Sequence, residues 1–239
     1  MHITIRLFAG LAEVMGTSSL SFNVEETSIT AGRLKELLSA SYPDAASQIS
    51  VSLVAIDHEY APEDSDIPEK AEIALIPPVS GGEASSIYES SPDGLYEVTN
   101  QVLLAEDILN KVLDTNHGAS LLFVGTTREM TGEQHTTALF YEAYIPMAIS
   151  KLQEIGKEVQ ERWNARCAIT HRLGLVGLKE ASVIIAVSSP HRDTCYEASR
   201  YAIEKLKQMV PIWKQDINEK GHIWKGFEGQ TEGSSKMEP

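Results

Sequence analysis

Two lysines near the end of the sequence have the residue type and spacing for amine chemistry. Lys207 falls in the last turn of a predicted helix, and Lys214 follows beyond a break at Pro211. Two ammonium groups brought together favour loss of a proton from one of them, which makes a neutral amine accessible as a base or nucleophile. The simpler interpretations are a surface ion pair of Lys207 with Glu204 and an edge-strand charge for Lys214. The spacing alone favours these simpler interpretations.

Further basic residues are suited to binding an anion. His191 and Arg192 follow a strongly apolar run, where the end of a strand presents groups to a ligand, and Arg128 follows another apolar run. Arginine offers a rigid fork of donors to a phosphate, and histidine adds a charge-assisted donor. Loop cations that bond to nearby carbonyl groups are an equally good interpretation. These residues indicate an anionic small molecule and little more.

The two cysteines, Cys167 and Cys195, cannot form a disulfide framework, and their spacing fits neither a zinc site nor an iron–sulfur cluster. Cys195 borders the basic residues and has the chemistry of a nucleophile. A small buried residue at the start of a helix is the commoner case. Such cysteine usage indicates a reducing, cytoplasmic environment. We expect no tightly bound cofactor and no metal.

The stretch 76–82, Ile-Pro-Pro-Val-Ser-Gly-Gly, has the character of a tail. A predicted strand leads into two stiff prolines and then into Gly81 and Gly82, which have no side chains and can enter a narrow site. A tail of this kind should end at its second glycine. The chain instead continues to Pro239.

The charge and hydropathy of the chain exclude several partners. Its net charge of −14 argues against nucleic acid, because phosphate contacts need a basic surface. No apolar run is long enough to cross a bilayer, so no membrane partner is expected. The N-terminus alternates apolar and polar residues and is therefore predicted to be a strand rather than a signal peptide.

The elements that must position these residues divide the chain into two predicted domains of the α+β class. Residues 1–82 have the order strand, strand, helix, strand, strand of a β-grasp, with Thr30 as the helix cap and a hairpin connection over 11–18. The predicted strands are 2–8, 19–25, 51–57 and 72–78, and the predicted helix is 31–42. The segment 83–93 that follows is small and polar and is predicted to be a linker or the entry to the next unit.

The second domain is predicted over residues 94–228, before a flexible tail over 229–239. Its apolar runs alternate between strand and helix periods, and the run 181–192 is so apolar that it should be central in its sheet. The predicted strands are 94–100, 119–129, 136–144, 167–176, 181–192, 211–217 and 222–227, and the predicted helices are 103–114, 146–163 and 194–210.

Several of these stretches resemble molybdopterin synthase. Residues 7–17 and 71–82, with the Pro-Pro-Val-Ser-Gly-Gly ending, closely resemble its small, sulfur-carrying, ubiquitin-like subunit. The later part of the chain resembles its large, catalytic subunit, which implies an α/β-hammerhead-type fold. The matching stretches are 121–129, 169–174, 184–198, 205–215 and 223–224. The resemblance implies that the chain is a fusion, with Gly82 as the former end of the small subunit.

The resemblance also implies a reaction. In this family a partner enzyme adenylates the terminal glycine and converts it to a thiocarboxylate, which here would form at Gly82. Sulfur then passes to cyclic pyranopterin monophosphate, and two rounds build the dithiolene of molybdopterin. The family also implies a homodimer through the large-subunit domain, in which His191 and Arg192 reach the site of the other protomer. The implied site residues are the catalytic Lys207 and Lys214, the substrate-binding Arg128, His191 and Arg192, and the apolar Phe123 and Ile203.

The sequence departs from the family in two respects. A family arginine beyond the last tryptophan would fall near Glu228, where Lys225 is a possible replacement. A thiocarboxylate also needs a free carboxyl group, which the Gly82–Glu83 amide does not provide.

Three alternatives to a self-supplied synthase cleaved after Gly82 stay open. The uncut chain can work with a separately encoded small subunit. It can serve as a non-catalytic ubiquitin-like scaffold or regulator, or it can relay sulfur through a persulfide on Cys195. The retention of all five basic residues argues against the scaffold.

Overall fold

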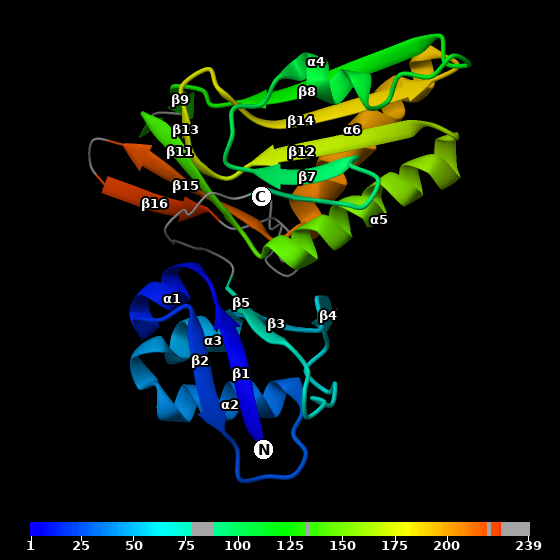
Figure 1. Ribbon diagram of the computed structural model, residues 1–239. Coiled ribbons are helices and arrows are strands. Elements are labelled where there is room, and N and C mark those ends of the chain that lie inside the picture. Colours follow the sequence, from blue (N-terminus) through cyan, green and yellow to red (C-terminus); the bar gives the residue numbers. More distant parts are fainter. Residues whose placement is uncertain (78–87, 132–133, 219–220, 226–239) are drawn as a thin grey trace, which may run out of the picture. The chain divides into compact units, whose positions relative to one another are not determined.

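The computed structural model of the chain describes residues 1–77, 88–131, 134–218 and 221–225. It divides into two compact units, one comprising the N-terminal residues together with Trp213–Gln215, Trp224 and Lys225, and one made of most of the residues from 88 onward (Figure 1). Each unit has its own hydrophobic core, and each is described by itself.

The N-terminal unit is a β-grasp, as the sequence predicts. Its five-stranded sheet has the order β2-β1-β5-β3-β4, in which β1 and β5 run parallel and the other neighbours antiparallel. Alternate residues of β1 are buried, so one face of this strand lies against the core. The strands are β1 (His2–Leu7), β2 (Ser19–Asn23), β3 (Leu53–Ile56), β4 (Glu59–Ala61) and β5 (Ile73–Ile76).

Helix α2 (Ala31–Ser41) covers this sheet. The Thr30 hydroxyl caps it by accepting a hydrogen bond from the Arg33 amide at 3.2 Å, which confirms the predicted start. Leu34 and Leu38 on one face of the helix are fully buried in the core. At one helical turn apart they form the stripe that holds the helix on the sheet.

The predicted hairpin connection over 11–18 is wrong, because this segment contains helix α1 (Ala9–Met15). Leu11 is fully buried and anchors the helix in the core. Gly16 ends it with φ 66°, a left-handed conformation that glycine adopts without strain. Sequence reasoning also missed β4, the short helix α3 (Ala46–Val51) and the 3₁₀ turn Pro43–Ala45.

The C-terminal unit is built on a five-stranded sheet of order β6-β7-β12-β14-β8. Strand β12 runs parallel to β7 and antiparallel to β14, which in turn runs antiparallel to β8. The strands are β6 (Tyr88–Ser90), β7 (Tyr96–Thr99), β8 (Ala119–Thr126), β12 (Arg166–Arg172) and β14 (Ala181–Ser189). A four-stranded sheet β13-β11-β15-β16 and the pair β10-β9 complete it. They are formed by β9 (Met130–Thr131), β10 (Gln134–His135), β11 (Ala138–Ala143), β13 (Gly174–Gly177), β15 (Ile212–Asn218) and β16 (Gly221–Lys225).

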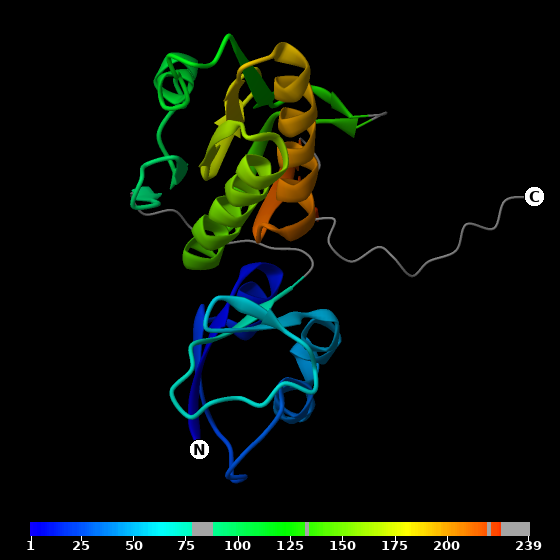
Figure 2. The ribbon, with the colours of Figure 1, turned by 90° about the vertical axis from the view of Figure 1, so that its right-hand side faces the viewer.

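Helices cover both faces of the five-stranded sheet (Figure 2). Helices α5 (Ile145–Trp163) and α6 (Arg192–Met209) pack on one face, and the short α4 (Ala105–Asn110) packs on the other. Helix α5 lies very close to β7, since a Cβ added at Gly156 would stand 1.6 Å from the Tyr96 hydroxyl oxygen. Packing on this sheet fixes the position of α6, and α6 carries several of the predicted site residues.

Three predictions about this unit are wrong in detail. The run 119–129 forms an edge strand, β8, in which Val124 is 41% exposed, rather than a buried strand. The run 167–176 divides into β12 and β13, which belong to different sheets, and Gly174 with φ 76° lies at the division. Helix α4 is shorter than predicted, and Leu104 at its N-cap is 60% exposed instead of lying on the apolar face.

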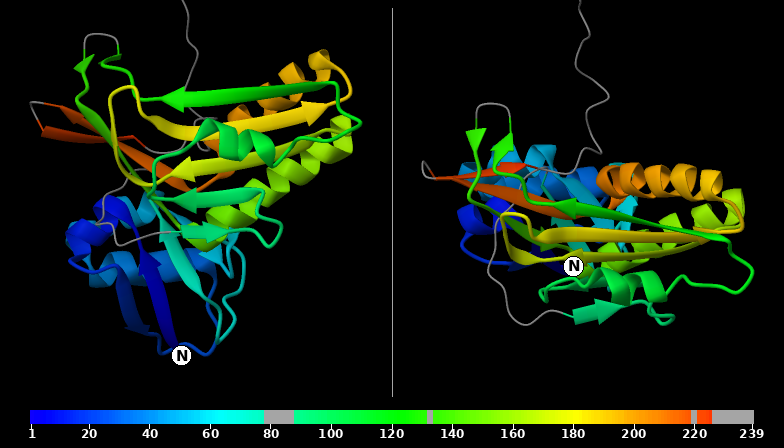
Figure 3. Two further views of the ribbon diagram at one scale, coloured as in Figure 1. Left: turned by 45° about the horizontal axis from the view of Figure 1, so that its top comes forward. Right: turned by 90° about the horizontal axis from the view of Figure 1, so that it is seen from above.

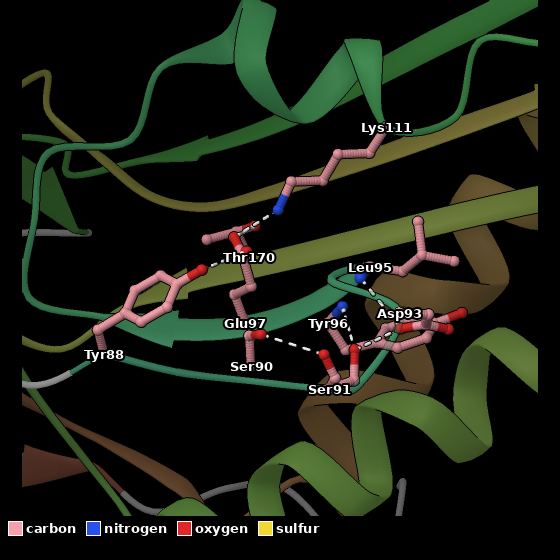
Figure 4. A network of polar contacts seen from close by, with 9 residues as sticks. All are labelled: Tyr88, Ser90, Ser91, Asp93, Leu95, Tyr96, Glu97, Lys111 and Thr170. Atoms are coloured by element: carbon pink, nitrogen blue, oxygen red, sulfur yellow. Dashed lines mark hydrogen bonds and ion pairs between the residues drawn. The ribbon is translucent and has the colours of Figure 1, made fainter.

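Where the structure describes the segment 83–93, it agrees with the entry to the next unit rather than with a linker. Residues 88–90 form β6, and a tight turn leads into β7 (Figure 4). In this turn the Ser91 hydroxyl donates to the Asp93 carboxylate at 2.6 Å and accepts from the Tyr96 amide at 3.0 Å. Asp93 also accepts from the Leu95 amide at 3.1 Å. Turn residues in the sequence therefore mark a hairpin and not a domain boundary.

No helix within the described ranges is long and apolar enough to cross a membrane. Among the same residues, no group of three or more His, Cys, Asp or Glu side chains is arranged to hold a metal ion.

Candidate active site

Helix α6 places Lys207 at its C-terminal end. Ala198, Ala202 and Leu206 bury one face of the helix against the core, and Lys207 is exposed in the last turn. A lysine there interacts favourably with the helix dipole. In the part of the chain that the structure describes, no ion pair joins Lys207 to Glu204. The simpler interpretation of Lys207 as one half of a surface ion pair is therefore wrong.

Lys214 lies just beyond the end of the same helix. A short connection over Val210 and Pro211, with the Ile212 amide donating to the Val210 carbonyl at 2.7 Å, turns the chain into β15. Lys214 is exposed on this strand. Lys214 thus follows Lys207 across one short connection, and the pairing of the two amines stays a prediction.

Arg128 lies at the same end of the five-stranded sheet as Lys207. It follows β8, whose Thr126 pairs with Ala181 at the start of β14. Helix α6 follows β14 and packs back along β14 and β8, so its last turn returns to this end of the sheet (Figure 3). The topology therefore brings Arg128 and Lys207 to one end of the sheet.

The two apolar residues predicted for the site, Phe123 and Ile203, lie on β8 and α6. Phe123 is on β8 and packs against the core formed by the sheet with α5 and α6. Ile203 on α6 belongs to the same core and is 9% exposed. Both therefore belong to one hydrophobic core, and their role as the apolar lining of a site stays a prediction.

His191 and Arg192 lie at the opposite end of α6. His191 is the N-cap residue and Arg192 begins the helix, so the predicted strand over 181–192 is wrong at its end, which lies at Ser189. Both side chains are exposed, and Arg192 Nε lies 3.8 Å from the Asp193 carboxylate. Lys207 is fifteen positions after Arg192 in the same helix, which corresponds to a rise of roughly 22 Å along the axis. Within one chain, this pair is not brought to the lysines.

Some predicted site features lie outside the described residues. These are Gly81 and Gly82, Glu228, and the side chain of Lys225. The role of the diglycine and the replacement of the missing family arginine stay predictions.

His171 and Arg172 make contacts within the fold of the C-terminal unit. His171 is 4% exposed, with Nδ1 2.9 Å from the Arg172 carbonyl oxygen, and burial lowers the pKa of its imidazole to about 4. The Arg172 guanidinium donates to the Glu180 carboxylate at 2.9 Å. Both side chains hold the sheet together.

Sequence reasoning missed a polar cluster on the α4 side of the sheet (Figure 4). Glu97 on β7 pairs with Lys111, accepts a bond from the Tyr88 hydroxyl at 3.0 Å and accepts another from Thr170 at 3.3 Å. The bond to Glu97 raises the pKa of the Tyr88 hydroxyl.

Both cysteines are buried. Cys195 is 2% exposed, and its thiol lies 3.2 Å from the Ser189 hydroxyl and 3.5 Å from the Ala119 carbonyl oxygen. Cys167 is fully enclosed, and burial raises the pKa of its thiol to about 12. A persulfide relay needs an accessible thiolate, so this geometry opposes the relay through Cys195.

We therefore expect Cys195→Ala and Cys167→Ala to leave turnover largely intact when a thiocarboxylated small subunit is supplied. The reason is that neither thiol is accessible to a substrate. The measurement is conversion of cyclic pyranopterin monophosphate to the dithiolene, with circular dichroism as the control for folding. Loss of turnover in a well-folded Cys195→Ala protein would restore the persulfide relay.

Comparison with known proteins identifies the C-terminal unit. Residues 98–209 match the family model described as MoaE protein. The molybdopterin synthase catalytic subunit of Bacillus subtilis is 49% identical over 137 residues, which cover 57% of this chain and 87% of that protein. The chain belongs to the family of molybdopterin synthase catalytic subunits. The catalytic subunit from Halalkalibacterium halodurans is 46% identical over 148 residues, covering 60% of this chain and 95% of its own.

The crystal structure of molybdopterin synthase from Staphylococcus aureus has the same fold. It superposes with a TM-score of 0.53 and 42% identity, covering 54% of this chain and 95% of its own. Residues 5–82 match a second family model, the ThiS family of sulfur carriers. The chain is therefore a molybdopterin synthase catalytic domain fused behind a ubiquitin-like sulfur-carrier domain.

Proposed function

We propose that the chain transfers sulfur from a thiocarboxylate at Gly82 to cyclic pyranopterin monophosphate, after cleavage of the Gly82–Glu83 bond. The observation that carries this proposal is the presence of both family matches, to a sulfur carrier and to a synthase, in one chain. We place the carrier domain at residues 1–82 and the catalytic domain at 94–228. An adenylating and sulfurating enzyme that recognises the Gly82 tail is the partner that this chemistry requires.

In this proposal Lys207 and Lys214 serve the chemical step. Sulfur transfer from an acyl thiolate needs proton donors and stabilisation of a developing oxyanion, and two neighbouring amines supply both. Their exposure on either side of one turn supports a site that an incoming glycine tail can reach. Phe123 and Ile203 line its apolar floor.

Arg128, His191 and Arg192 bind the phosphate of the substrate. Because roughly 22 Å of helix separates Arg192 from Lys207, one site needs His191 and Arg192 from a second protomer. The active form is therefore a homodimer formed through the catalytic domain. Each dimer has two equivalent sites, as expected for a symmetric assembly.

We expect Arg128→Ala and Arg192→Ala each to weaken substrate binding by about 1.5–3 kcal/mol, because each removes a charged hydrogen bond to the phosphate. Calorimetric titration with cyclic pyranopterin monophosphate measures the affinity. Arg162→Ala is the matched control, since Arg162 stacks 4.5 Å above the Tyr201 ring on the α5–α6 surface. Unchanged affinity in both variants would contradict the assignment of Arg128 and Arg192 to phosphate binding.

Mixing two variants tests the shared site. An equal mixture of Lys207→Ala chains, which are impaired in the chemical step, and Arg192→Ala chains, which bind substrate weakly, forms hybrid dimers in which one site carries both changes and the other carries neither. At low substrate concentration such a mixture should recover about a quarter of wild-type turnover. No recovery in a mixture shown to exchange protomers would place all site residues within one chain.

A further inference from the structure

The turn that carries His191 and Arg192 lies beside a loop that precedes β8. In this loop, residues 111–118, the Asp114 carboxylate accepts bonds from the Asn116 amide at 2.8 Å and from the Arg166 guanidinium at 3.2 Å. Arg166 also donates to the Lys111 carbonyl at 3.2 Å. The Asn116 amide, and next to it Arg166, hold the pKa of the Asp114 carboxyl below its usual value. The loop is thus fastened to strand β12.

One histidine connects this loop to the end of β14. His117 Nδ1 lies 2.8 Å from the hydroxyl oxygen of Ser188, which is 1% exposed. The Ser188 hydroxyl donates its own proton to the Val112 carbonyl. Its oxygen therefore accepts from His117, which assigns the proton to Nδ1. Beside this contact, Gly118 approaches the Pro190 carbonyl so closely that an added Cβ would be 3.0 Å from it.

The neighbouring serine holds the same turn from inside. Ser189 is fully buried, and its hydroxyl donates to the His191 carbonyl at 2.6 Å and contacts the Cys195 thiol at 3.2 Å. The backbone on both sides of Pro190 is therefore bonded. In contrast, the His191 side chain makes no capping bond to the helix and is left for other contacts.

We propose that His117 is a positioning residue for the anion-binding turn of His191 and Arg192. This inference rests on the proposed function, in which that turn binds the phosphate of the substrate. Two cations on a fixed turn lose little conformational freedom on binding, whereas the same cations on a loose turn must be ordered by the ligand. His117 and its bond to Ser188 supply that order without touching the substrate.

The test compares three variants of the full chain. His117→Ala removes the bond to Ser188. His117→Asn retains a donor near the Nδ1 position. The control is His2→Ala, which removes a histidine with a comparable 2.7 Å bond, to Asn23, in the other unit.

Two readouts separate positioning from general stability. Hydrogen–deuterium exchange of the amides over 188–195 should accelerate in His117→Ala and not in the other two variants. In steady-state assays the KM for cyclic pyranopterin monophosphate should rise about tenfold in His117→Ala with kcat within about twofold, because only binding of the phosphate is affected. His117→Asn should restore most of the KM.

Failure of this inference is distinguishable from failure of the proposed function. Unchanged exchange over 188–195 in His117→Ala would overturn the positioning role whatever the enzyme does. Faster exchange with an unchanged KM, in a protein whose wild-type form turns over, would also overturn it. If the wild-type chain shows no turnover even when a thiocarboxylated small subunit is supplied, the proposed function fails, and the exchange measurement still decides whether His117 orders the turn.

Discussion

Replacing Lys207 with alanine is expected to lower conversion of cyclic pyranopterin monophosphate to the dithiolene by ~10²-fold or more, the usual loss for a proton-transfer group. The fold should survive, because Lys207 is exposed and forms no ion pair with Glu204 in the described part of the chain. The cost in unfolding free energy should stay well under ~1 kcal/mol. Lys157→Ala is the matched control, since Lys157 is also exposed on a helix. Its Nζ lies 3.9 Å from the carboxylate oxygen of Glu161, four residues later.

Arginine at either lysine position separates charge from proton transfer. Arginine keeps the positive charge but does not readily give up a proton. We expect Lys207→Arg to remain badly impaired and Lys214→Arg to be less so, because in the proposed site Lys214 acts partly as a charge that anchors the substrate. Thiocarboxylated small subunit is supplied separately, so that an uncut chain is not mistaken for a dead site. Near-normal turnover by the Lys207→Ala, Lys214→Ala double variant would contradict the catalytic role of the two lysines and favour the scaffold interpretation.

The second large effect is expected at the junction between the two domains. A thiocarboxylate forms only on a free carboxyl group, so an uncut Gly82–Glu83 bond should abolish self-supplied turnover completely. Glu83→Pro makes the bond resistant to most peptidases, because the imide has a fixed φ and no N–H group. We expect this chain to stay full length in the native host and to make no dithiolene from its own carrier domain.

Two controls show what this result means. Ser86→Pro places a proline in the same segment without changing the cleaved bond, and it should be processed normally. The Glu83→Pro chain should still turn over when a thiocarboxylated small subunit is added, because its catalytic domain is intact. Self-supplied turnover by the full-length Glu83→Pro chain would contradict the proposed processing.

The sequence predicts the elements whose signals are local. The alternation of β1, the Thr30 cap of α2 and the long amphipathic patterns of α5 and α6 each depend on a few neighbouring residues, and each is found in the structure. Within residues 1–82, the predicted order of strands and helix is that of a β-grasp. Strong local signals of this kind agree with the global fold in natural proteins.

The predictions that failed depend on contacts between distant residues. The run 119–129 is apolar enough for a buried strand, but β8 has a neighbour only on the β14 side, so its outer residues are exposed. The turn residues before β7 suit a linker as well as a hairpin, and pairing of β6 with β7 decides between them. Helix α1 replaces a hairpin because Leu11 is buried, which no local pattern reveals.

The candidate site was predicted in the same uneven way. The types of Lys207, Lys214 and Arg128 pointed to amine chemistry on an anion, and the topology places Arg128 and Lys207 at one end of a sheet. The contact of His117 with Ser188 spans 71 residues and has no signal in the sequence. Only the folded chain shows that it fixes the turn carrying Arg192.

The most direct test of the account is intact mass spectrometry of the protein from its native host, before and after addition of cyclic pyranopterin monophosphate. The account predicts a fragment ending at Gly82 with the mass of the thiocarboxylate. Addition of the substrate should convert it to the carboxylate while the dithiolene forms, and Lys207→Ala should block that conversion. A chain that is found only at full length in cells making the cofactor would contradict the account.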